Sequence, residues 1–139
     1  MRFMVIVRST PDIESGRLPS KEELERMGTF NEELASAGVL LQGDGLRASK
    51  DGSARIHFGG ERPSVVDGPF TETKELIAGF WMVQMKSLEE AKEWFTRAPM
   101  QPGDTLEIRR VFEADDFGDA LSPELRAKEE RMRIGGLGK

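Results

Sequence analysis

Two runs of the chain are apolar on both faces of the strands that they would form. They are residues 2–8 (RFMVIVR) and residues 76–85 (LIAGFWMVQM), which place apolar side chains at consecutive positions. A strand with one wet face instead alternates apolar and polar residues, because successive side chains point to opposite faces. Both faces of these two strands must therefore be covered when the chain folds.

A segment with helical periodicity follows each of the two runs. Ser20 with Glu23 has the spacing of a capping box at the start of a helix, and Ser87 with Glu90 repeats it. Gly38 stands where the first helix would end in a left-handed residue. The apolar residues of the two predicted helices recur every three or four positions: Leu24, Met27, Phe30, Leu34 and Ala37 in the first, and Leu88, Ala91, Trp94, Phe95 and Ala98 in the second.

The rest of the chain completes a β-α-β-β-α-β order. Residues 39–41 begin a second strand, and residues 105–112 form a last one. Residues 9–19 contain two prolines and a glycine, and they predict a loop. The order favours an α+β fold of the ferredoxin-like type, with an antiparallel sheet and two helices on one of its faces.

An inserted β-hairpin is predicted between the second and the central strand. Asp51-Gly52 is typical of a hairpin turn. Residues 54–58 and 64–66 then predict two short strands, with Gly59-Gly60 after the first of them. The insertion brings the chain to Asp67.

The second face of the sheet predicts a homodimer. Two helices cover only one face, whereas the first and central strands are apolar on the other face as well. An exposed face of that kind would be a larger apolar patch than monomers usually carry. A symmetric dimer that packs sheet against sheet would remove the patch.

A sharp turn with a dense group of charges precedes the central strand. The turn is residues 67–70 (Asp-Gly-Pro-Phe), in which Asp67 can bond its own backbone and Pro69 disfavours a helical conformation of the residue before it. Three charged residues follow at the entrance to the strand: Glu72, Lys74 and Glu75.

Residues 67–75 resemble the signature of the DGPF family, a branch of the YCII-related proteins. Residues 30–34, 37–40 and 107–111 also resemble segments of that family, so that the resemblance covers roughly residues 1–117. It implies the architecture of a dimeric α/β barrel. It also implies a neighbourhood of extracytoplasmic-function sigma factors, alongside which similar proteins are often found.

Asp67 and His57 are the candidate catalytic residues. Asp67 is either a turn-forming residue or a carboxylate at the mouth of a cleft, where it would act as a general base or ligand anchor. His57 is the only histidine. It is either structural or a partner of Asp67 in an acid–base dyad, if the hairpin folds back. YCII-related proteins are thought to use such a pair, but His57 aligns with no histidine of the family motif.

The candidate ligand-binding residues are Glu72, Lys74, Glu75 and Arg47. In an extended chain, Glu72 and Lys74 would share one face and Glu75 would take the other. They form either a solvated run, with an ion pair of at most about 1 kcal/mol, or part of a site or interface. Arg47 would offer a guanidinium to an anionic ligand. The adjacent Arg109-Arg110 would point to opposite faces of the last strand.

Composition excludes several classes of function. The net charge of −5 argues against a non-specific nucleic-acid surface, and the lack of cysteine excludes disulfides and thiolate chemistry. With one histidine, no metal site is predicted, and no nucleotide-binding motif points to a cofactor. The longest apolar run, residues 76–83, is too short to cross a membrane. The expected compartment is the cytoplasm.

The chain divides into a domain, residues 1–113, and a C-terminal extension, residues 114–139. The sequence of the extension predicts an acidic turn around Gly118, a short peripheral helix that begins at Ser122-Pro123, and a flexible end.

Two functions fit the chain. One is a small dimer that binds a small polar or anionic molecule beside Asp67, with or without cofactor-free acid–base chemistry. The other is a non-enzymatic regulatory module that binds a protein partner through its charged motif.

Overall fold

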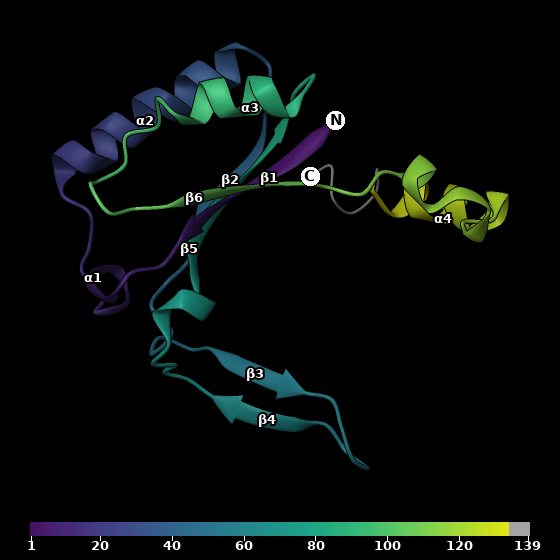
Figure 1. Ribbon diagram of the computed structural model, residues 1–139, viewed down its shortest axis with the longest axis horizontal. Coiled ribbons are helices and arrows are strands. Elements are labelled where there is room, and N and C mark those ends of the chain that lie inside the picture. Colours follow the sequence, from purple (N-terminus) through teal and green to yellow (C-terminus); the bar gives the residue numbers. More distant parts are fainter. Residues whose placement is uncertain (134–139) are drawn as a thin grey trace.

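The fold is built on a four-stranded antiparallel sheet, as a computed structural model of residues 1–133 shows (Figure 1). The strands lie in the order β2-β5-β1-β6, and their bounds are Leu40–Gly45, Ile77–Gln84, Arg2–Arg8 and Leu106–Arg110, respectively. The two runs that are apolar on both faces therefore form the two central strands. The prediction of an α+β fold with an antiparallel sheet is confirmed, and the element order is consistent with the ferredoxin-like type.

Two helices, α2 (Lys21–Ser36) and α3 (Leu88–Phe95), cover one face of the sheet (Figure 1). The Ser20 hydroxyl accepts a hydrogen bond from the Glu23 N–H at 3.1 Å, and the Ser87 hydroxyl accepts one from the Glu90 N–H at 3.1 Å. Gly38 follows α2 with a φ of 75°. Both predicted helices and their serine caps are confirmed. The glutamate half of each predicted capping box is not formed within residues 1–133, because Glu23 accepts from Arg17 and Glu90 from the Lys86 N–H.

The core lies between the helices and this face of the sheet. Three aromatic rings form its centre, and the centroids of Phe30, Trp81 and Phe95 lie 5.2 to 6.0 Å apart. The indole N–H of Trp81 donates to Oδ1 of Asn31 at 2.8 Å, so that its polar atom is satisfied. The other buried apolar residues are Phe3, Val5, Leu34, Val83, Met85 and Ala91.

The opposite face of the sheet carries four apolar side chains in two rows. Met4 pairs with Met82, and Ile6 with Phe80, across the central strands. All four are half-buried. The edge strands place polar residues in the same two rows, namely Gln42 and Asp44 on β2 and Arg109 and Glu107 on β6. The apolar strip is therefore formed by the two central strands, as the sequence predicts, and polar residues of the edge strands flank it.

Residues 9–19 are not only a loop, because they contain the short helix α1 (Pro11–Glu14). The Thr10 hydroxyl accepts a hydrogen bond from the Ile13 N–H at 3.2 Å, and Pro11 takes the first helical position. Proline is suited to that position, where its missing N–H would have had no partner. The Thr-Pro pair was therefore a start signal rather than a loop signal.

The inserted hairpin is a separate two-stranded sheet of β3 (Ala54–His57) and β4 (Ser64–Asp67). The interpretation of Asp51-Gly52 as a hairpin turn is wrong, because it connects β2 to β3, which lie in different sheets. The turn of the hairpin is instead residues 58–63. In Figure 1 the hairpin extends well away from the helices.

The C-terminal extension forms η2 (Ala114–Ala120) and α4 (Pro123–Met132). The Ser122 hydroxyl caps α4 by accepting from the Leu125 N–H at 3.1 Å, so that the predicted helix is confirmed. No residue of α4 is buried. The predicted flexible end lies outside the described residues. No helix within residues 1–133 is both long enough and apolar enough to span a membrane.

Candidate functional site

The turn at residues 67–70 packs against residues 48–53, which lead into the hairpin. Ser49, only 6% exposed, is the centre of this contact. Its hydroxyl accepts a hydrogen bond from the Phe70 N–H at 2.8 Å and donates to Oε1 of Glu14, which also accepts from the Ser49 N–H at 2.8 Å. One side chain thus ties α1, the loop and the turn together.

Gly68 stands where the turn passes closest to this loop. Its N–H donates to the Ser53 carbonyl oxygen at 2.9 Å, and the following peptide, Gly68–Pro69, is cis. A Cβ atom at this position would overlap the Ser53 hydroxyl and the Ser49 carbonyl oxygen. Close backbone approach therefore requires glycine here.

A pocket of about 260 Å³ lies beside this junction. Two carboxylates, Glu14 and Glu75, and the Arg47 guanidinium line it, together with the Ser49 and Ser53 residues of the loop. The remaining lining residues are apolar: Leu46, Phe70, Leu76 and Ile77. Within residues 1–133, both hydrogen bonds that Glu14 accepts go to Oε1, which leaves Oε2 for another donor. The arrangement offers hydrogen-bond acceptors and one cation beside an apolar wall.

Arg55 fastens the hairpin to the same junction. Its guanidinium carbon lies 4.0 Å from the centre of the Phe70 ring, and Nη2 lies 3.2 Å from Oε2 of Glu75. Stacking and ion pairing of this kind use the planar guanidinium, which lysine lacks. Arg55 of β3 therefore contacts two residues that line the pocket, Phe70 and Glu75.

The structure does not bring Asp67 and His57 together within the chain. Asp67 is exposed at the end of β4, opposite Ala54, whereas His57 lies opposite Ser64. The two positions are three pairs apart along the hairpin, so that their side chains point to opposite faces of it. Of the two alternatives for His57, the dyad with Asp67 is therefore not formed within one chain. Neither residue lines the pocket.

The charged residues after the turn are divided between the pocket and its surroundings. Glu75 and Arg47 line the pocket, although Arg47 is 82% exposed and its Nε lies 3.8 Å from Oδ2 of Asp51. Glu72 and Lys74 are exposed outside it. The extended chain expected here is wrong, because Thr73–Glu75 form a turn of 3₁₀-helix that the Glu72 carboxylate caps.

Sequence reasoning missed Glu14, Ser49 and Ser53 as residues of this site. Glu14 and Ser49 are 35 residues apart, and only the fold brings them together. A serine and a glutamate in a polar segment carry no periodicity that would single them out. Phe70, by contrast, lies in the motif itself. Arg109 and Arg110 do point to opposite faces of β6, and neither lines the pocket.

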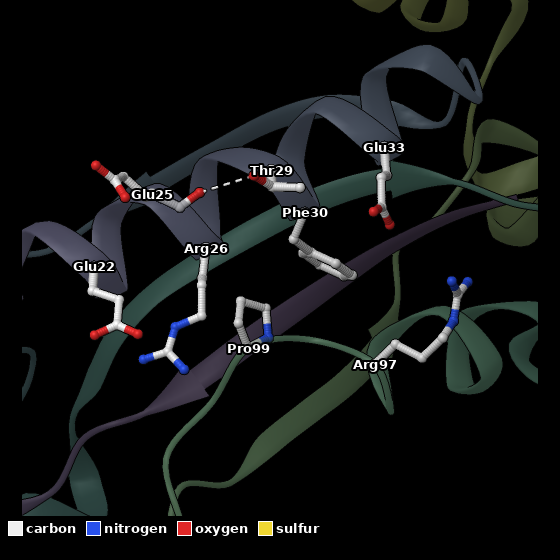
Figure 2. A pocket seen from close by; sticks show the side chains of 8 residues that line it. All are labelled: Glu22, Glu25, Arg26, Thr29, Phe30, Glu33, Arg97 and Pro99. Carbon is white, nitrogen blue, oxygen red and sulfur yellow. Dashed lines mark hydrogen bonds between the residues drawn. The ribbon is translucent and has the colours of Figure 1, made fainter.

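A larger groove, of about 440 Å³, lies on the helix side of the molecule (Figure 2). It runs between α2 and the segment after α3, with Phe30 at its floor and Arg97 and Pro99 opposite. Its remaining lining residues belong to α2: Glu22, Glu25, Arg26, Thr29 and Glu33. None of the residues predicted from the motif lines this groove.

Within residues 1–133, no group of three or more histidine and carboxylate side chains is placed to hold a metal ion.

Comparison with known proteins places the chain in a family. An uncharacterised protein of Rhizobium meliloti (strain 1021) is 35% identical over 79 residues, which are 54% of this chain and 63% of that protein's length. A solved structure of 5-chloro-2-hydroxyhydroquinone dehydrochlorinase from Burkholderia phenoliruptrix AC1100, in complex with 2,5-dihydroxybenzoquinone, is 14% identical with a TM-score of 0.44, and the match covers 84% of this chain and 98% of that one. The narrower DGPF assignment stays a prediction. Because the YCII-related domain matches residues 1–115, the chain belongs to the YCII-related family.

Proposed function

We propose that the protein is a homodimer that binds a small polar or anionic molecule in the pocket beside the DGPF turn. The observation that carries the proposal is the lining of this pocket, where Glu14, Glu75 and Arg47 stand beside an apolar wall. Ligand pockets usually combine apolar walls with a few polar groups that fix orientation. A volume of about 260 Å³ suits a small molecule.

The lining indicates which groups a ligand would carry. Oε2 of Glu14 would accept a hydrogen bond from a hydroxyl or amine, and Arg47 would pair with a carboxylate or another anionic group. The Phe70 ring and Leu76 would contact an apolar or aromatic part. If the protein is an enzyme, Glu14 and Glu75 are the pocket residues that could take a proton from such a ligand.

The sheet face that α2 and α3 do not cover supports the proposed dimer. Met4, Ile6, Phe80 and Met82 form an apolar strip across the centre of that face. A second copy related by a two-fold axis would pack the same strip against the first, as an isologous interface requires. This arrangement would give the dimeric α/β barrel that the family resemblance implies.

A ligand screen with matched variants tests the proposed site. Thermal unfolding of the wild type would be measured with a library of small hydroxy acids, amino acids and phenolic acids, and then repeated on Glu75→Gln, on Arg47→Gln and on Glu72→Gln. Glu72→Gln is the matched control, since Glu72 carries the same charge three residues away, outside the pocket. A ligand at 100 times its Kd stabilises the folded protein by about 2.7 kcal/mol.

We expect a compound that raises the Tm of the wild type and of Glu72→Gln but not that of Arg47→Gln or Glu75→Gln. Circular dichroism must first show that all four proteins are equally folded. A compound that stabilises all four equally would place its site elsewhere and contradict the proposal. If no compound binds, the regulatory module gains support, since Glu72, Lys74 and Asp67 are exposed and available to a protein partner.

A further inference from the structure

Two segments project from the body of the molecule as arms. The hairpin arm is residues 54–67, which comprise β3, β4 and their turn, and the C-terminal arm is residues 112–133, which comprise η2 and α4. Figure 1 shows both arms extending toward the side of the sheet that α2 and α3 leave open. They come from distant parts of the sequence and flank the same sheet face.

Both arms expose large apolar side chains. On the hairpin arm, Ile56 and Val65 lie directly opposite each other on one face and are 57% and 63% exposed, while Phe58 at the turn is 83% exposed. On the C-terminal arm, Phe112 and Phe117 stack with their ring centroids 4.9 Å apart, yet both are at least half exposed. Leu125 and Met132 on α4 are also exposed. Grouped apolar residues of this kind usually mark an interaction surface.

The roots of both arms are fixed to the body, although the apolar side chains that the arms carry are exposed. Ser49 and the Arg55–Glu75 pair hold the hairpin arm. At the root of the C-terminal arm, Arg2 Nε lies 2.9 Å from Oε1 of Glu113, and the Arg2 guanidinium also donates to the Phe112 carbonyl oxygen at 3.2 Å. These contacts fix the point at which each arm leaves the body.

We infer that the two arms of each protomer close over the body of a second copy of this chain. The inference rests on the homodimer of the proposed function and adds the surface that would complete its interface. The bare sheet face has four strands of about six residues, which make an area of roughly 400 Å². A stable specific interface takes about 800 Å² from each partner. The sheet face alone falls short, and the arms supply apolar surface on the same side.

A second copy is favoured as the occupant over an unrelated protein because of where the arms lie. A copy packed on the open face would stand between the hairpin arm and the C-terminal arm, and would meet both. Its own two arms would reach back over the first copy by the same two-fold operation. One symmetric contact would thus cover the open sheet face and the apolar residues of all four arms.

Thiol labelling can test the inference directly, because the sequence has no cysteine. Val65→Cys on the hairpin arm and Leu24→Cys on α2 introduce single thiols at positions of matched exposure, 63% and 58%. Maleimide labelling would be followed by mass spectrometry at protein concentrations well above and well below the dimer Kd. We expect labelling of Val65→Cys to slow at least tenfold in the dimer, and labelling of Leu24→Cys to stay unchanged.

Dimer affinity gives a second readout. Phe58→Gln with Val65→Thr on one arm, and Phe117→Gln on the other, should each raise the dimer Kd at least tenfold in sedimentation experiments, whereas Leu24→Gln should leave it unchanged. A dimer in which Val65→Cys labels as fast as in the monomer, with unaltered Kd for the arm variants, would overturn the inference and leave the sheet-face dimer and the ligand site standing. A wild-type protein that never dimerises would overturn both the proposed dimer and the inferred role of the arms. The ligand screen would still test the pocket in that case.

Discussion

The two faces of the central strands are built from the same kind of residue but have different surroundings. On one face Val5, Val83 and Trp81 lie beneath α2 and α3 and are at most 5% exposed. On the other face Ile6 and Phe80 stay half-buried, with no helix of residues 1–133 packed over them (Figure 1). Successive side chains of each central strand therefore point in turn to a core that the helices of the same chain cover and to a face that they leave uncovered.

Strands that are apolar on both faces can be interpreted in the light of this contrast. Such a pattern shows that both faces need cover, but it does not show what provides the cover. Here the chain supplies helices for one face, and we propose that a second copy supplies the rest. Variants on the two sides should therefore differ in whether their effect depends on protein concentration.

The largest effect is expected on the helix-covered face. Leu34 is a fully buried residue of α2, and Leu34→Ala should lower the free energy of unfolding by about 3 kcal/mol through lost burial and the cavity left behind. Leu24→Ala, on the same helix but 58% exposed, should cost less than about 0.5 kcal/mol. Urea unfolding followed by circular dichroism measures both. Equal losses for the two leucines would contradict the assignment of the core.

A smaller effect is expected where the hairpin arm joins the body. Gly68→Ala should destabilise by about 2 kcal/mol, because its Cβ would overlap the Ser53 hydroxyl and the Ser49 carbonyl oxygen. Gly59→Ala is the control, since nothing lies within 4 Å of a Cβ placed there and its φ is not positive. Thermal unfolding compares the two variants. A Gly68→Ala protein as stable as Gly59→Ala would show that the turn is not packed as described.

The open face should respond through assembly rather than through the fold of one chain. Phe80→Gln should raise the dimer Kd at least tenfold, which is about 1.4 kcal/mol, because it places an amide in the apolar strip. The far-UV circular dichroism spectrum should stay that of the wild type. Sedimentation velocity over a dilution series measures the change, with Leu24→Gln as the control. A dimer of unchanged affinity in Phe80→Gln would remove this face from the interface.

The smallest effect concerns the root of the C-terminal arm and depends on pH. Hydrogen bonds from Arg2 hold the pKa of Glu113 below its ordinary value of 4.5, against the opposing effect of its partial burial. A lowered folded-state pKa means that the ion pair stabilises the protein above about pH 4.5, and that this contribution is lost as the pH falls through the folded-state value.

Glu113→Gln should therefore cost at most about 1 kcal/mol at neutral pH and nothing at strongly acidic pH, since the pair is partly exposed. Unfolding curves of the wild type and the variant at a series of pH values measure the difference. A difference in stability that stays constant down to strongly acidic pH would contradict the role of the Arg2–Glu113 pair.

Much of the fold followed from local signals in the sequence. The strands apolar on both faces, the serine caps and Gly38 predicted the sheet and its two helices correctly. Local signals failed where the structure depends on which strands pair. Asp51-Gly52 is a turn whether or not the strands on its two sides pair with each other. Here they do not pair, because β2 and β3 belong to different sheets.

The candidate site could be predicted only in part. Residues 67–75 identified the region, and Glu75 and Arg47 do line its pocket. Glu14 and Ser49 could not be found, because their hydrogen bonds join segments 35 residues apart. The pairing of His57 with Asp67 failed on register, since two residues separated by an odd number of pairs in a hairpin face opposite sides.

We propose that a second copy of the chain covers the open face of the sheet. Sedimentation equilibrium of the unmodified wild type, over a wide range of protein concentrations, tests it most directly. We expect twice the mass of one chain at high concentration, with reversible dissociation on dilution. A protein that has the mass of one chain at every concentration would show that no second copy covers this face.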